Sequence, residues 1–157
     1  MTISRFIVTR LTDRVPSEDA QTRLVAVIAV GGTAWFLVGV AVLHIAERGL
    51  NPARHMVSEY ALGAYGWIQT LDFLAAGIGA IALGKALART SREPGRMGPL
   101  LIAGFGVSSL VVAFLQADGD GQVTTHGGIH TLVSILGFAA LVAGMFTFAR
   151  RFRRDPS

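Results

Sequence analysis

Residues 24–46 read LVAVIAVGGTAWFLVGVAVLHIA and carry no formal charge. A helix needs about 20 apolar residues to cross the hydrocarbon layer of a bilayer, and this run has that length. A helix that is apolar on every side has no face to present to water, so it belongs in a membrane or in a large protein core. The run therefore predicts a membrane-spanning helix.

Three further runs have the same character. Residues 97–117 and 131–149 are also free of formal charge, and residues 66–84 contain only Asp72. Across the chain 52% of residues are hydrophobic and 15% are charged, whereas a soluble domain carries about 25% charged residues. We therefore expect an all-α integral membrane protein, a bundle of four antiparallel transmembrane helices. The expected spans are 24–46, 66–84, 97–117 and 129–149.

Basic residues are concentrated at alternate ends of these spans. The head of the chain, the second connection and the tail are rich in arginine, whereas connection 47–65 has two arginines and connection 118–125 has no basic residue. Excess Lys and Arg marks the cytoplasmic side of a membrane, which predicts an N-in/C-in topology with both of these connections outside. The expected parts are a cytoplasmic segment 1–23, a transmembrane domain 24–150 and a basic cytoplasmic tail 151–157.

The charge pattern and the absence of cysteine narrow the range of functions. The arginine clusters have no aromatic groove beside them, so they indicate topology and contact with anionic membrane lipid rather than with nucleic acid. The chain contains no cysteine, which excludes disulfides and thiolate chemistry.

Polar residues gather on the predicted outer side. They include all four histidines, and the candidates for a shared ligand pocket are His44, His55, Ser58, Glu59, Asp72 and Asp118. Asp72 lies deeper in the membrane than the other candidates, roughly 9 Å inside the second span. An aspartate at mid-span costs about 2.5–3.5 kcal/mol on insertion scales. We expect its side chain to face the interior of the bundle and to be either paired or protonated.

His126 and His130 open the fourth span. They are one helical turn apart and can point the same way, a spacing familiar from zinc sites. The glutamate of the HExxH motif is missing, because Gly127 follows His126. Three interpretations stay open: a metal site with Asp118 as a third ligand, a hydrogen-bonded interfacial cluster, and a haem held by His44 and His130. Neighbouring polar residues that could join a pocket or bond their own helix are Gln116, Ser108 and Ser109.

Three longer stretches carry a resemblance. They are NPARHMVSEYALGAYGWIQTLDFLAAGIG, FLQADGDG and THGGIHTLVSILGF. They resemble a family of small bacterial polytopic membrane proteins known as domain of unknown function 998. The residues that match its outer H-x-x-S-E/D segment, second-span polar position, acidic loop and H-G-x-x-H opening are His55, Ser58, Glu59, Asp72, Asp118, His126 and His130. The resemblance implies a multi-pass protein of the bacterial plasma (inner) membrane, with no established activity.

A looser likeness concerns residue types alone. Alkaline ceramidases and the progestin/adiponectin-type receptors use a Ser, an Asp and three histidines to hold zinc near one membrane face. The same residue types are offered by Ser58, Asp118, His126 and His130, with His55 or His44 as a third histidine. This analogy implies a zinc-dependent hydrolase acting on lipid amides or esters at the outer leaflet.

The leading functional hypothesis is an outward-facing His/Asp/Ser pocket that binds a lipid head group or a small ligand. We expect the protein to work within a complex, as a homo-oligomer or with a partner membrane subunit. The alternatives are the zinc-dependent hydrolase, with His126 and His130 as ligands and Asp118 or His55 as a third, and a haem-binding electron-transfer subunit. Whether the chain is an enzyme stays open.

Overall fold

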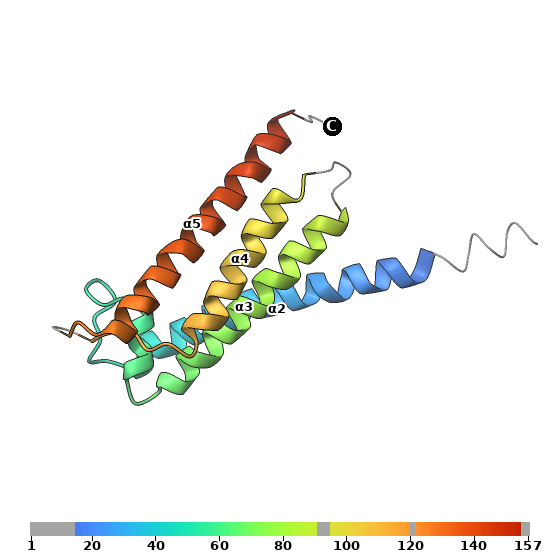
Figure 1. Cartoon of the computed structure of the whole chain (residues 1–157). Coiled ribbons are helices and arrows are strands. Elements are labelled where there is room, and N and C mark those ends of the chain that lie inside the picture. The colour runs from blue at the N-terminus through green and yellow to red at the C-terminus, as the bar shows by residue number, and fades with distance from the viewer. Residues whose placement is uncertain (1–14, 91–94, 120–121, 155–157) are drawn as a thin grey trace, which may run out of the picture.

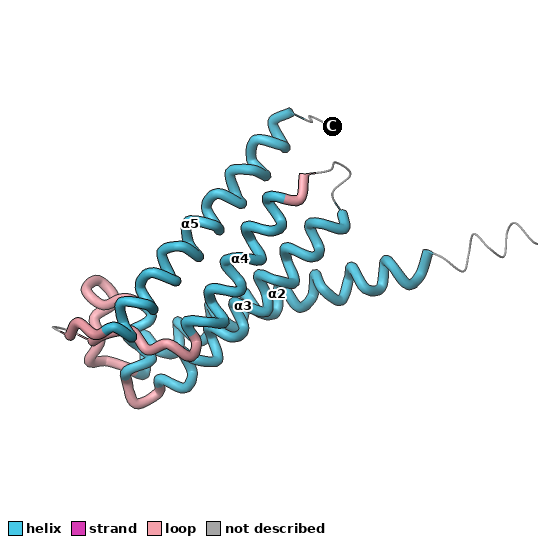
Figure 2. The backbone as a smooth tube through the Cα atoms, viewed as in Figure 1, coloured by secondary structure: helices cyan, strands magenta, loops and turns pink. Residues whose placement is uncertain are grey.

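The computed structural model describes residues 15–90, 95–119 and 122–154, and its regular structure there is entirely helical (Figures 1 and 2). The elements are α2 (Val15–Ala46), the 3-10 helix η1 (Val57–Leu62), α3 (Gly66–Thr90), α4 (Met97–Val112) and α5 (Thr125–Arg154). The prediction of an all-α protein is confirmed for these residues. Most of the predicted cytoplasmic head, part of the second connection and the last residues of the tail lie outside the described ranges.

Three helices have the length and composition of membrane spans. They cover Ala20–Ala46, Gly66–Thr90 and Thr125–Arg150, which is consistent with a membrane protein. α4 is as apolar but has only 16 residues. At 1.5 Å per residue it extends roughly 24 Å, which is less than the hydrocarbon thickness of about 30 Å.

The end of α4 differs from the predicted third span, which continued to residue 117. The helix ends at Val112, and two tight turns follow, in which the Phe114 and Leu115 amides donate to Val111 and Val112 at 3.1 and 3.2 Å. The carbonyl of Leu115 accepts instead from a histidine of α5, so the backbone leaves the helical path here. The predicted boundaries at 46, 66 and 97 coincide with those of the helices. α2 and α5 begin earlier than predicted, α3 ends later, and α5 continues into the predicted tail as far as Arg154.

The helices form an open row in which each packs against the next in the chain. α3 is central and contacts α2, α4 and η1, while α2 and α5 are the ends of the row and share no comparable contact among the described residues. Figure 1 shows the chain reversing direction from helix to helix, with α2 diverging from the other three. The end of α3 is tied to the start of α2, because the Arg89 guanidinium donates to Gln21 Oε1 at 3.0 Å.

Close approach of helix backbones holds the row together. A Cβ atom on Gly32 of α2 would lie 2.9 Å from the Cα of Gly79 in α3, and one on Gly106 of α4 would lie 2.7 Å from the carbonyl oxygen of Gly77. Small residues allow such contact, which is a main source of helix association in lipid, where tails are as apolar as leucine. The central helix is therefore packed through glycine on two sides.

Candidate functional site

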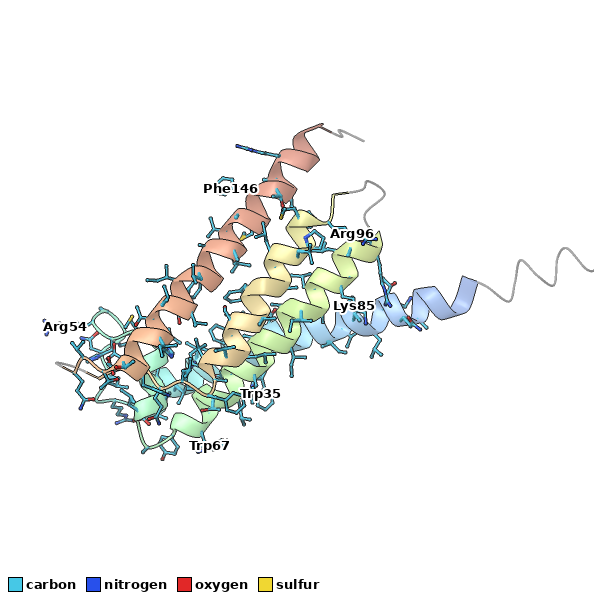
Figure 3. The ribbon with its side chains drawn as sticks, in the orientation of Figure 1. Trp35, Arg54, Trp67, Lys85, Arg96 and Phe146 are labelled. Atoms are coloured by element: carbon cyan, nitrogen blue, oxygen red, sulfur yellow. The ribbon has the colours of Figure 1, made fainter. Side chains whose placement is uncertain are left out.

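One end of the molecule, here called the histidine end, carries the candidate residues. It comprises the end of α2, η1, the start of α3, the residues that follow α4 and the start of α5. Figure 3 shows Arg54 and Trp67 at this end, and Arg96 and Phe146 toward the other. The Trp67 side chain is 63% exposed, as expected of an aromatic residue at a membrane–water interface.

Glu59 organises η1. Its Oε1 accepts the Met56 amide at 2.9 Å, and its Oε2 lies 2.8 Å from His55 Nδ1. The backbone bond from Met56 is the main cause that lowers the pKa of Glu59, and His55 contributes further, against a smaller opposing effect of burial. His55 and Glu59 therefore meet, as a pair that fixes the local turn. Ser58 lies between them in sequence and is half-buried.

His44 links α2 to η1. Its Nδ1 lies 2.7 Å from the Val40 carbonyl oxygen, within its own helix. Its ring packs on Tyr60 with centroids 5.1 Å apart, and Tyr60 is only 1% exposed. The imidazole thus covers the tyrosine that anchors η1.

Asp118 caps the start of α5. Its Oδ1 accepts the Thr124 hydroxyl at 2.6 Å and its Oδ2 accepts the Thr124 amide at 2.9 Å. The Thr124 hydroxyl in turn accepts the Gly127 amide at 3.0 Å, as an N-cap residue does. The hydroxyl bond and then the amide bond of Thr124 are the main causes that lower the pKa of Asp118, with weaker contributions from His126 and His130.

The two histidines of α5 lie in different surroundings. His130 is only 4% exposed, its Nδ1 lies 2.6 Å from the Leu115 carbonyl oxygen, and its ring stands edge-on to Phe73 at 6.4 Å. His126 is exposed. His126 and His130 are therefore in different environments, although they lie one turn apart on α5.

This geometry gives the metal and haem interpretations no support. Among the residues that the structure describes, no group of three His, Asp or Glu side chains is placed to hold a metal ion. Both oxygens of Asp118 bond Thr124, and His130 bonds a backbone carbonyl. A haem between His44 and His130 would need α2 and α5 to face each other, and these helices are not neighbours in the row.

A pocket of about 270 Å³ lies between α3, the end of α4 and the start of α5. Its polar lining consists of Thr70, Gln116 and His126, and its walls are apolar. The apolar lining residues are Ala61, Phe73, Val112, Ala113, Phe114 and Leu115. Ser108 and Ser109, the other polar residues noted for α4, instead donate to the Phe105 carbonyl of their own helix.

Asp72 is separated from both groups. It is 0% exposed and lies against the backbone of α2, since a Cβ atom on Gly39 would overlap its carboxyl oxygens. The sequence-predicted pocket residues are therefore divided among three places: the η1 group of His44, His55, Ser58 and Glu59, the α5 group of Asp118, His126 and His130, and Asp72 alone. Of all of them, His126 lines the pocket described above.

With the geometry in place, the chain can be compared with known proteins. A family model described as "Protein of unknown function (DUF998)" matches residues 24–157. The chain belongs to the DUF998 family. Neither the curated proteins nor the solved structures include a match to it. The family predicted from the motifs is thus confirmed.

In this DUF998 protein, sequence reasoning missed several residues of the histidine end. Tyr60 and Gln69 are fully buried, Thr70 lines the pocket, and Thr124 caps α5. Thr124 stands before an apolar run and so carries a capping signal that could have been found. Gln69 and Thr70 carry no such signal, because uncharged polar residues are common at the ends of membrane helices.

Proposed function

We propose that the protein is a four-span, N-in/C-in protein of the bacterial plasma membrane, whose pocket at the histidine end binds a lipid head group at the outer face. The topology rests on the arginine-rich head, second connection and tail. In this arrangement α4 and the non-helical residues 113–117 that follow it cross the membrane together. Irregular backbone is tolerated at membrane depth where protein covers it. In this segment Ala117 is buried and Ala113 and Leu115 are half-buried, whereas Phe114 and Gln116 are exposed.

The observation that carries the binding proposal is the mixed lining of the pocket. Gln116 and His126 offer an amide and an imidazole, which donate and accept hydrogen bonds. The Thr70 hydroxyl donates to the Gly66 carbonyl of its own helix at 3.4 Å and offers an acceptor. The remaining lining residues have apolar side chains, so a ligand with a polar head and an attached hydrocarbon chain fits this lining. Pockets for drug-sized ligands measure about 300–1,000 Å³, and a volume of about 270 Å³ suits a head group.

The test is lipid binding by protein purified in mild detergent. Phosphatidylglycerol and phosphatidylethanolamine are added separately, and the rise in melting temperature is measured for each. We expect at least one lipid to stabilise the wild type and Gln116→Ala with His126→Ala to abolish that effect. Gln122→Ala is the matched control, because Gln122 is exposed and lies outside the pocket lining. Equal stabilisation of all three proteins would contradict the proposal.

A further inference from the structure

Asp72 is a buried acid with no counter-charge. Its side chain is 0% exposed, and neither of its oxygens accepts a hydrogen bond from a described residue. The indole of Trp35, on α2, lies near the carboxyl group, but its geometry does not meet that of a hydrogen bond. Because Asp72 is sealed within a single chain, neither lipid head groups nor a partner subunit can reach it without moving a helix.

The elements packed around Asp72 supply no cation. α4 contains no titratable residue, and the residue of α2 nearest to the histidine end that could carry a charge is His44, which bonds the Val40 carbonyl. In η1, Glu59 bonds Met56 and His55, and Tyr60 keeps a buried hydroxyl without a partner in the described residues. Lys85 and Arg89 lie at the far end of α3. An ionised carboxylate here would be desolvated and unpaired, which strongly favours the neutral acid.

We propose that Asp72 is a proton-binding site within the membrane, filled from the histidine end. The reaction is simple addition of a proton from water to the carboxylate, giving the neutral acid. A proton fits where a metal ion does not, because the backbone at Gly39 lies directly against both carboxyl oxygens and leaves no room for coordination. This site is distinct from the proposed lipid pocket and does not depend on it.

The polar route to Asp72 leads in one direction only. One turn nearer the histidine end, Gln69 is also 0% exposed, and both atoms of its amide have no partner in the described residues. Toward the other end, the contact between α2 and α3 passes through Gly32 and Gly79. The nearby hydroxyl of Thr33 donates to the Ala29 carbonyl of its own helix. The site therefore stores a proton and does not conduct one across the membrane.

Protonation is coupled to helix packing in this arrangement. The carboxyl group can rest on the α2 backbone only while it is neutral, since an ionised group would draw water between α2 and α3. Loss of the proton should loosen the contact between these two helices at their histidine ends. We therefore expect deprotonation of Asp72 to change the packing of α2 against α3.

Infrared spectroscopy of the protein in lipid bilayers tests the proposal. At neutral pH we expect a carbonyl band of a protonated carboxylic acid, which is lost in Asp72→Asn and retained in Glu59→Gln. Glu59 is a suitable control because hydrogen bonds hold it as a carboxylate. Identical spectra for the wild type and Asp72→Asn in this region would overturn the proposal.

A second measurement covers the case in which Asp72→Asn does not fold. Wild-type protein with isotope-labelled aspartate carboxyl groups is studied by solid-state NMR at neutral pH. We expect one aspartate signal at the position of a neutral acid, shifting on exchange into heavy water only as fast as the histidine end admits solvent. If every aspartate signal is that of a carboxylate, Asp72 is ionised and the proposal is wrong.

Discussion

At the scale of single residues, the partner of a side chain decides its role more than its type does. His126 and His130 have the same chemistry and lie one turn apart, yet one is exposed and the other is held by the Leu115 carbonyl. Their spacing could be read from the sequence. Their difference could not, because the carbonyl that binds His130 belongs to another element, and it becomes available only because α4 ends early.

Replacement of His130 by leucine should destabilise the protein. The change replaces the imidazole with an apolar side chain of similar bulk and leaves the Leu115 carbonyl without its partner, which costs about 1–3 kcal/mol. Thermal unfolding in detergent measures the loss. His126→Ala is the control and should change stability by no more than about 0.5 kcal/mol, because His126 is exposed. A similar loss for both variants would show that His130 is not a structural residue.

Glu59 should make the η1 turn sensitive to acid. Its folded-state pKa lies below the usual 4.5, chiefly because of the Met56 amide. The ionised carboxylate therefore stabilises the fold above pH 4.5, and this contribution is lost as the pH falls through the lower folded-state pKa. The protection of the Met56 amide, its exchange rate compared with the intrinsic rate at the same pH, should fall over that range in the wild type. In Glu59→Gln the exchange should show no such acid-dependent step, and a step of equal size there would contradict the assignment.

At the scale of elements, the sequence predicts which segments form helices, but it does not predict which faces of those helices pack together. Uncharged runs long enough to cross a membrane identify α2, α3 and α5 directly. The faces that meet are set by a few glycines among many, since the chain has 19. Gly31 and Gly32 are neighbours, but only Gly32 lies against α3, where the backbones of Ala75 and Gly79 come close.

These two glycines give a matched test of the contact between α2 and α3. Gly32→Ala places a methyl group against the backbone of α3, and such overpacking typically costs about 1–3 kcal/mol. Gly31→Ala meets no atom within 4 Å and should be neutral or stabilising by up to about 1 kcal/mol, since alanine is the better helix former. Melting temperatures of the two variants decide the matter, and equal values would mean that α2 does not pack through this face.

At the scale of the whole molecule, all four histidines lie at one end, and most of the basic residues in the described ranges lie toward the other. The segments at that other end contain Arg23, Lys85, Arg96 and Arg150, whereas Arg48 and Arg54 lie at the histidine end (Figure 3). This separation could be predicted, because it follows from the order of charged and uncharged segments along the chain. The division of the histidine end into three places could not, because it depends on backbone partners such as Leu115, Thr124 and Gly39.

In the proposed topology the two ends of the molecule lie on opposite sides of a membrane, with the histidine end outside. The chain has no cysteine, so a single cysteine can be placed at Asn51, exposed at the histidine end, or at Gly95, exposed at the other. Intact cells are treated with a maleimide that cannot cross the membrane. We expect labelling of Asn51→Cys in intact cells and of Gly95→Cys only after permeabilisation. Labelling of both positions from outside, or the reverse order, would contradict it.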